Sequence, residues 1–235
     1  MSPPPFDAMK EFALRQNGAL SELESVDLSI IPADSEAARN TLELFLNAAC
    51  RGNLFAMSTC AGLYRGGWGT AIEPAQALVW ARRAADAGYP PGLFQLGLCH
   101  ETGAGVERNP DLAMAYLTQA ADDGYSMAAL HLAIHHHSGE VWPRNPDRAV
   151  HYASLAFELG DPFAGHLLGS WHEAGDGIRQ DNSTAMRWYL AAASKGSLLA
   201  ANRLVLVYSF GQLGVVPDYE LAHQYLELGQ QGTTP

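Results

Sequence analysis

The apolar pattern of residues 89–124 predicts two helices joined by a short loop. Gly92, Leu96, His100 and Gly103 follow one another at spacings of four, four and three, so they share one face of a helix. The sequence Gly-Ala-Gly that begins at Gly103 then ends this first helix, because glycine favours turns over helix interiors.

The second helix of this segment has its own start and stop signals. Asn109 is a side-chain cap residue, and Pro110 has the fixed φ that suits the first helical turn. The helix runs to Gly124, where glycine can adopt a left-handed conformation at little steric cost. The same start is predicted at Glu73 with Pro74 and at Asn145 with Pro146, while Asp181 and Asn182 are expected to supply side-chain caps without a proline.

This hairpin recurs through the chain with a period of 36 residues, since glycine stands at positions 52, 88, 124, 160, 196 and 232. Further columns keep the register: a small residue four positions after the glycine (Ala56, Gly92, Ala128, Ala164, Ala200), and a ring twelve after it (Tyr64, His100, His136, His172, Tyr208). A lone hairpin cannot bury its apolar face, so the repetition predicts an all-α solenoid. In the last repeat the later pair, Ala222 and Tyr225, slips by one position.

The repeats define the expected domain organisation. A solenoid over residues 35–232 holds one half repeat, residues 35–52, and five full repeats: 53–88, 89–124, 125–160, 161–196 and 197–232. Residues 1–34 form an acidic N-terminal cap, with a helix expected from Phe6 to Leu23 and an extended connection over 24–32. Residues 233–235 are a tail.

Two repeats carry a recognisable motif: GLFQLGLCHETGAGV at 92–106 and AGHLLGSWHEAGDGI at 164–178. With the later A-x-x-W or A-x-x-Y and the closing A-A-x-x-G, they resemble the Sel-one-like repeat (SLR) family, relatives of the tetratricopeptide repeat. The resemblance implies a right-handed α-α superhelix of five helical hairpins plus an N-terminal half repeat or cap, serving as an adaptor or scaffold for other proteins. Exported members with one disulfide per repeat have been linked to β-lactamase activity, but their cysteine pairs are missing here.

Composition narrows the function classes. The formal charge of −11 argues against nucleic acid, which is bound through lysine and arginine, and favours a basic partner. No apolar run is long enough for a membrane span, and the first residues lack a secretory signal. Cys50, Cys60 and Cys99 form no disulfide framework and no paired metal spacing, so we expect the reducing cytoplasm.

The nine histidines raise the question of metal binding. His131 and His135 share a helical face and could supply two zinc ligands. The consecutive residues 135–137 point about 100° apart, and the ring column places its histidines one repeat apart, too far for shared ligation. No nucleophile elbow or phosphate loop occurs. We therefore expect no catalytic, cofactor-binding or metal-binding residue, and the His131 and His135 pair stays open.

Partner binding is expected on the concave face that first helices line in such arrays. The candidates are Phe94, Gln95, Leu98, His131, Ile134, His166 and Arg203, with Trp68 and Trp142 in the loops. The alternative is that Phe94, Leu98 and Ile134 only pack helices together. Loop packing is the corresponding alternative for the two tryptophans.

These observations favour a non-catalytic, bacterial-type cytoplasmic scaffold or adaptor that binds a protein or peptide. An immunity or inhibitor protein that neutralises a basic toxin or secreted effector is the first alternative, motivated by the charge of −11 and the modest size. A hydrolase of β-lactamase-like type is a more distant one. The sequence leaves self-association open.

Overall fold

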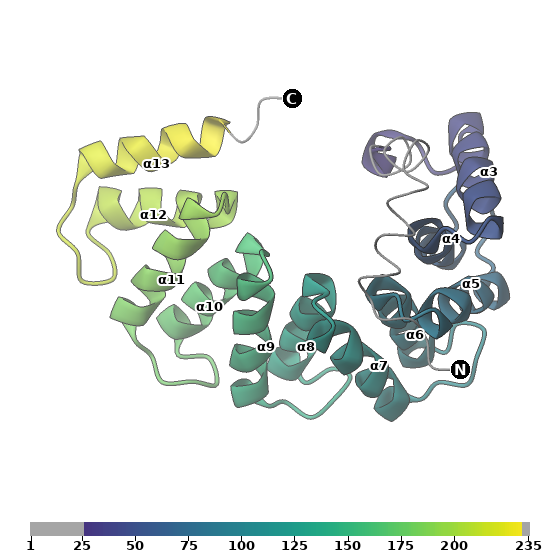
Figure 1. The fold of residues 1–235 in the computed structure, drawn as a ribbon. Coiled ribbons are helices and arrows are strands. Elements are labelled where there is room, and N and C mark those ends of the chain that lie inside the picture. Colours follow the sequence, from purple (N-terminus) through teal and green to yellow (C-terminus); the bar gives the residue numbers. More distant parts are fainter. Residues whose placement is uncertain (1–25, 232–235) are drawn as a thin grey trace. The chain divides into compact units, whose positions relative to one another are not determined.

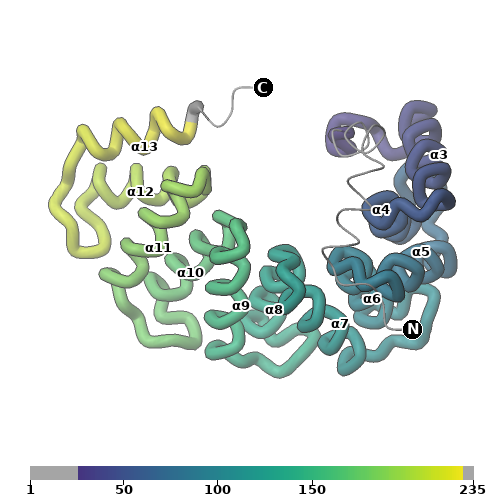
Figure 2. Tube along the Cα trace, in the orientation of Figure 1, coloured from purple at the N-terminus to yellow at the C-terminus, as the bar shows by residue number. Residues whose placement is uncertain are grey.

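Antiparallel pairs of helices follow one another along the chain (Figure 1). The computed structural model describes residues 26–231, which contain eleven α-helices, one short 3-10 helix and no strand. The contacts divide the chain into two units, the first ending at Asp123 and the second beginning at Gly124. Each unit is a set of consecutive hairpins, and Figure 2 follows the chain through both.

The helices have nearly uniform lengths and spacing. The first unit contains η1 (Leu28–Ile30), α3 (Glu36–Cys50), α4 (Leu54–Gly66), α5 (Pro74–Asp86), α6 (Pro90–Thr102) and α7 (Pro110–Asp122). The second contains α8 (Ser126–Ser138), α9 (Pro146–Glu158), α10 (Pro162–Ala174), α11 (Asn182–Ser194), α12 (Leu198–Phe210) and α13 (Tyr219–Gln231). The first helices of the repeats are α4, α6, α8, α10 and α12, and they confirm the predicted all-helical solenoid.

The caps account for most helix starts. The Asn109 side chain accepts a hydrogen bond from the Leu112 amide at 3.0 Å, as predicted. Glu73, in contrast, makes no side-chain cap, so its expected likeness to Asn109 is limited to the following proline. Asp181 caps α11, whereas Asn182 is the first helical residue and was wrongly predicted to supply a cap.

Glycine ends both helices of a hairpin by one mechanism. Gly103 at the end of α6 has φ +78°, and Gly88 after α5 has φ +73°. These left-handed conformations would strain any residue with a side chain, which explains why the glycine columns keep their period.

Small residues let each first helix approach the preceding second helix. A Cβ built on Gly92 would lie 2.5 Å from the Ala84 Cβ and 2.7 Å from its carbonyl carbon. Ala164 and Leu168 occupy the equivalent seam in the second unit and are fully buried. The small-residue column is thus a packing column between successive hairpins.

The ring column packs each first helix on its own partner helix. His136 is buried and stacks on Tyr152, with ring centroids 5.8 Å apart. His100 stacks in the same way on Tyr116 at 5.7 Å. These two histidines are therefore packing rings.

The N-terminal end of the described chain is partly as predicted. Ser35 caps α3 through a bond from the Ala38 amide at 3.1 Å, which confirms the half-repeat helix. The expected extended connection is wrong over η1, where Asp27 accepts a bond from the Ser29 amide and closes a short turn. The helix expected from Phe6 to Leu23 lies outside the described residues.

Candidate protein-binding face

Six exposed apolar side chains gather on the first helices of the second unit. We call them the first-helix face: Met127 and Ile134 of α8, Phe163 of α10, and Leu199, Leu206 and Phe210 of α12. Buried columns of alanine and leucine hold the same helices in place, so the exposed residues are not needed for the core. Scattered apolar residues are ordinary on a surface, whereas a repeated row of them points to binding.

The row follows from the helical and repeat periods together. Leu199, Leu206 and Phe210 are seven and four residues apart, which places them on one face of α12. Met127, Phe163 and Leu199 stand at the same position of three consecutive repeats. Since α10 and α12 lie side by side, the row continues from one first helix to the next.

The predicted binding residues divide into three groups. Ile134 is exposed and lies on the first-helix face, while His131, His166 and Arg203 are half-buried on the same helices. Phe94, Leu98 and Trp142 are buried, which agrees with the packing alternative for these three. The remaining two candidates, Gln95 and Trp68, are half-buried in the first unit.

Sequence reasoning missed Met127, Phe163, Leu199 and Phe210. A signal was available for Met127, Phe163 and Leu199, because the position three after each repeat glycine is apolar throughout: Phe55, Pro91, Met127, Phe163 and Leu199. Periodicity within a single helix could not separate this column from the core columns, since both are apolar. The burial of each residue in the structure separates this exposed column from the core columns.

A polar cluster of Glu173, Tyr189 and Arg203 lies beside the apolar row in the second unit. Glu173 of α10 pairs with the Arg203 guanidinium of α12, with the Arg203 Nε donating to the Glu173 Oε2 at 3.0 Å. The hydroxyl of the buried Tyr189 donates to the same oxygen at 2.8 Å. The Glu173 carboxylate thus joins α10, α11 and α12, and Arg203 also donates to Gln212 in the loop after α12.

Burial and hydrogen bonding have opposite effects on the pKa of Glu173. Burial raises the pKa of Glu173, but the hydrogen bonds from Arg203 and Tyr189 outweigh it and leave the pKa below its usual value. The pKa of Tyr189 is raised, first by burial and then by its bond to Glu173. Burial lowers the pKa of His166, which disfavours its charged form. The cluster therefore presents a compensated ion pair rather than a reactive group.

A second polar cluster ties the loops of two successive repeats. His137 stacks on Trp171 at 4.3 Å between centroids, and its Nε2 lies 3.1 Å from Asp176 Oδ2. Arg144 pairs with the other oxygen of Asp176. Because burial lowers the pKa of His137, the imidazole at neutral pH acts mainly as a packing ring.

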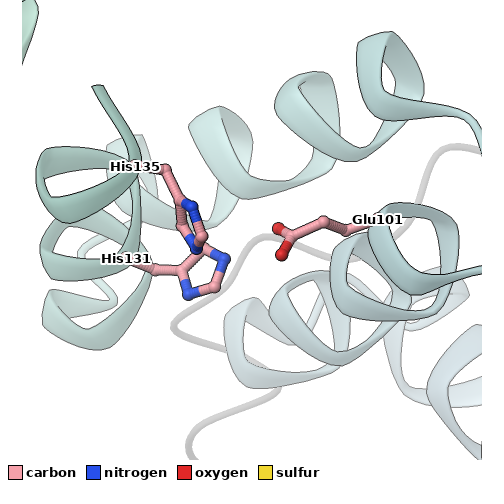
Figure 3. Close-up of side chains that lie close together, drawn as sticks. All are labelled: Glu101, His131 and His135. Carbon is pink, nitrogen blue, oxygen red and sulfur yellow. The ribbon is translucent and has the colours of Figure 1, made fainter. Parts of the chain in front are cut away.

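Figure 3 shows two histidines of the second unit whose ring nitrogens lie close together. His131 and His135 project from successive turns of α8, with ring centroids 4.3 Å apart. Glu101, also drawn there, belongs to α6 of the first unit.

Within residues 26–231, no helix has both the length and the apolarity to cross a membrane.

The stacked 13-residue helices and their buried small-residue seams define the class of α-solenoid repeat proteins. The model of the Sel1 repeat matches residues 56–89, 90–125, 126–161, 162–197 and 198–229. The chain belongs to the Sel1 repeat family. Among curated proteins, none shows a significant match to the chain.

Solved structures show the same fold. A Sel1 repeat protein from Oxalobacter formigenes is 27% identical with a TM-score of 0.67, over 83% of this chain and 79% of that one. The immunity protein Pa5087 from Pseudomonas aeruginosa is 25% identical with a TM-score of 0.61, over 98% and 84%.

A third structure is c5321, described as a protective antigen of uropathogenic Escherichia coli with an SLR fold. It is 30% identical with a TM-score of 0.64 over 81% of this chain. The match spans only 40% of c5321, which is therefore a much longer protein.

Proposed function

We propose that this chain is a non-catalytic scaffold or adaptor that binds another protein or peptide through the first-helix face. The observation that carries the proposal is the row of exposed apolar residues at equivalent repeat positions, Met127, Phe163 and Leu199. Packed helices lie about 8 to 10 Å apart. A polyproline II segment advances about 9 Å in three residues and returns its side chains to the same face, so it could place one apolar side chain on each repeat.

The partner is expected to be basic on its charged surface. The chain carries 25 acidic residues against 14 lysines and arginines, and such an imbalance attracts cationic proteins over long distances. Beside the first-helix face, Glu173 is already paired with Arg203. The apolar side chains therefore supply the contact with the partner, and the net charge raises the rate of association.

Affinity capture with matched variants tests this proposal. The wild-type chain, Leu199→Lys with Leu206→Lys, and a control Val79→Lys serve as baits, since Val79 is exposed on the second helix α5. A protein retained by wild type and control but lost with the double variant is the expected result. Retention of the same proteins by all three baits would rule out this face.

An immunity function is the second candidate, favoured by the likeness to Pa5087 over 98% of this chain. An immunity protein forms a tight complex with a single toxin and abolishes its activity, whereas an adaptor holds several proteins together. Co-expression with each captured partner, with growth as the readout, separates the two. Rescue of growth by wild type but not by the Leu199→Lys, Leu206→Lys variant supports immunity, and a partner that is not toxic contradicts it.

A further inference from the structure

His131 and His135 form a pair of possible metal-ligand side chains within the second unit. Both stand on α8, four residues apart, and neither is fully exposed. The geometry points to a two-histidine chelate that binds one divalent transition-metal ion of the Zn²⁺ type, and this inference does not depend on the proposed protein binding.

The spacing of the two rings suits a shared ion. Side chains four residues apart lie one above the other on a helix, and the two centroids are 4.3 Å apart (Figure 3). A nitrogen of each ring lies within 4.8 Å of a nitrogen of the other. Zinc binds imidazole nitrogen at about 2.0 to 2.1 Å, so small rotations about the side-chain bonds bring both nitrogens into range.

The neighbouring Trp142 restricts His135, one member of the pair, before a metal arrives. Its indole is buried and packs edge-on against His135, with centroids 5.7 Å apart and planes at 85°. A ring already held by packing loses little rotamer freedom on ligation, and lost freedom is one of the main costs of binding. The supporting contact therefore favours a chelating orientation at modest entropic cost.

The other histidines on the last turns of α8 have different surroundings. His136 is buried against Tyr152, and His137 is stacked on Trp171 and paired with Asp176. Successive helical residues are rotated by about 100°, which sends the three consecutive histidines in different directions. The chelate is thus specific to the spacing of four and does not arise from histidine content alone.

Two protein ligands make a weaker site than the four of a closed structural zinc site. The open positions are held by water, or by a donor group of a bound partner. His131 lies four residues from Met127, on the helix that contributes Met127 and Ile134 to the first-helix face. A metal ion there would be within reach of whatever that face binds.

Calorimetric titration of the untagged full chain with ZnCl₂ tests the inference. We expect one Zn²⁺ per chain, and an affinity about tenfold or more lower in His131→Ala and in His135→Ala, since even the loss of outer-shell support costs metal sites 10- to 100-fold. His223→Ala and Cys50→Ser are controls, because both residues are exposed possible ligands elsewhere. Their affinity should equal that of wild type.

Thermal unfolding gives an independent readout, because an ion that binds only the native state raises the melting temperature. Zn²⁺ should raise it for wild type and leave the His131→Ala, His135→Ala double variant unchanged. Circular dichroism of that double variant checks that it is folded. The inference is overturned if wild type takes up no Zn²⁺, or if uptake survives in the double variant or is lost in a control.

Discussion

Helices α6 and α12 are the first helices of two different repeats, and equivalent residues on them have opposite environments. Leu98 of α6 and Leu206 of α12 stand at the same repeat position, yet Leu98 is 7% exposed and Leu206 is 47% exposed. Both are leucines on regular helices of 13 residues. A repeat column therefore specifies the residue type, while the surroundings of each repeat decide whether that residue supports the core or faces solvent.

The largest difference should come from placing a charge at these two positions. Leu98→Lys buries an unpaired ammonium group and should lower the free energy of unfolding by about 3 kcal/mol. Leu206→Lys, on the exposed face, should change it by less than about 0.5 kcal/mol. Urea denaturation followed by circular dichroism measures both. Equal losses in the two variants would break the comparison.

The next largest change in stability is expected at Gly92, where a first helix packs closely against the preceding second helix. Alanine is the common residue in the small-residue column, so repeat statistics favour Gly92→Ala as stabilising, whereas the close approach to Ala84 predicts a loss of about 1 to 3 kcal/mol. The matched change Ala164→Gly should cost about 1 kcal/mol through helix propensity. Melting temperatures decide between the two views, and a higher value for Gly92→Ala would contradict the seam geometry.

Tyr189 and Leu117 are buried at the same position of two repeats, but only Tyr189 has a hydroxyl that can form a hydrogen bond. The Tyr189 hydroxyl and Arg203 both bind Glu173, so Glu173→Gln should cost about 1 to 2 kcal/mol at neutral pH. The variant loses charge-assisted hydrogen bonds while keeping the shape of the side chain. Tyr189→Phe is the control that removes a single donor and should cost about 1 kcal/mol.

The pH dependence of the same variant gives a second test. Burial raises the pKa of Glu173, but the bonds from Arg203 and Tyr189 hold it below its ordinary value of 4.5. Its stabilisation is therefore complete above about pH 4.5 and is lost as the pH falls through the lower folded-state pKa. Melting curves from pH 7 to 3 should show the wild type losing more stability than Glu173→Gln. Parallel curves would contradict the assigned pKa shift.

The smallest effect compares two helix starts at one repeat position. The Asn145 side chain caps α9 through the Arg148 amide at 3.0 Å, whereas Glu73 makes no such bond at the start of α5. Asn145→Ala should cost about 1 kcal/mol and Glu73→Ala less than about 0.5 kcal/mol. Denaturation midpoints measure the difference. A larger loss for Glu73→Ala would show that glutamate supports α5 in another way.

The fold was largely predictable because its signals are local and repeated. Glycines at helix ends, asparagine caps and the column of small residues each act within one hairpin, and their common period of 36 residues gave the register. The one-residue slip of the last repeat is present as well, since α13 begins at Tyr219. The prediction was wrong where one residue type can either cap a helix or begin it: Asn182 begins α11 instead of capping it.

The candidate site was less predictable, because exposure depends on contacts between repeats. The sequence alone could not distinguish Leu98 from Leu206, nor a packing ring such as His136 from the half-buried His131 beside it. It also suggested Trp142 as an exposed anchor, whereas the indole is buried against the imidazoles of α8. Local patterns carry no information about which neighbour covers a side chain.

The sequence by itself determined the helices, their ends, the period and the membership in a repeat family, since steric limits on φ and short-range hydrogen bonds act between residues close in the chain. Only the tertiary structure decided which apolar columns are buried, that Glu173, Tyr189 and Arg203 meet from three helices, and that Trp142 supports the His131 and His135 pair. Those outcomes depend on packing between residues distant in the sequence, where the same side chain is stabilising when covered and available for binding when it is not.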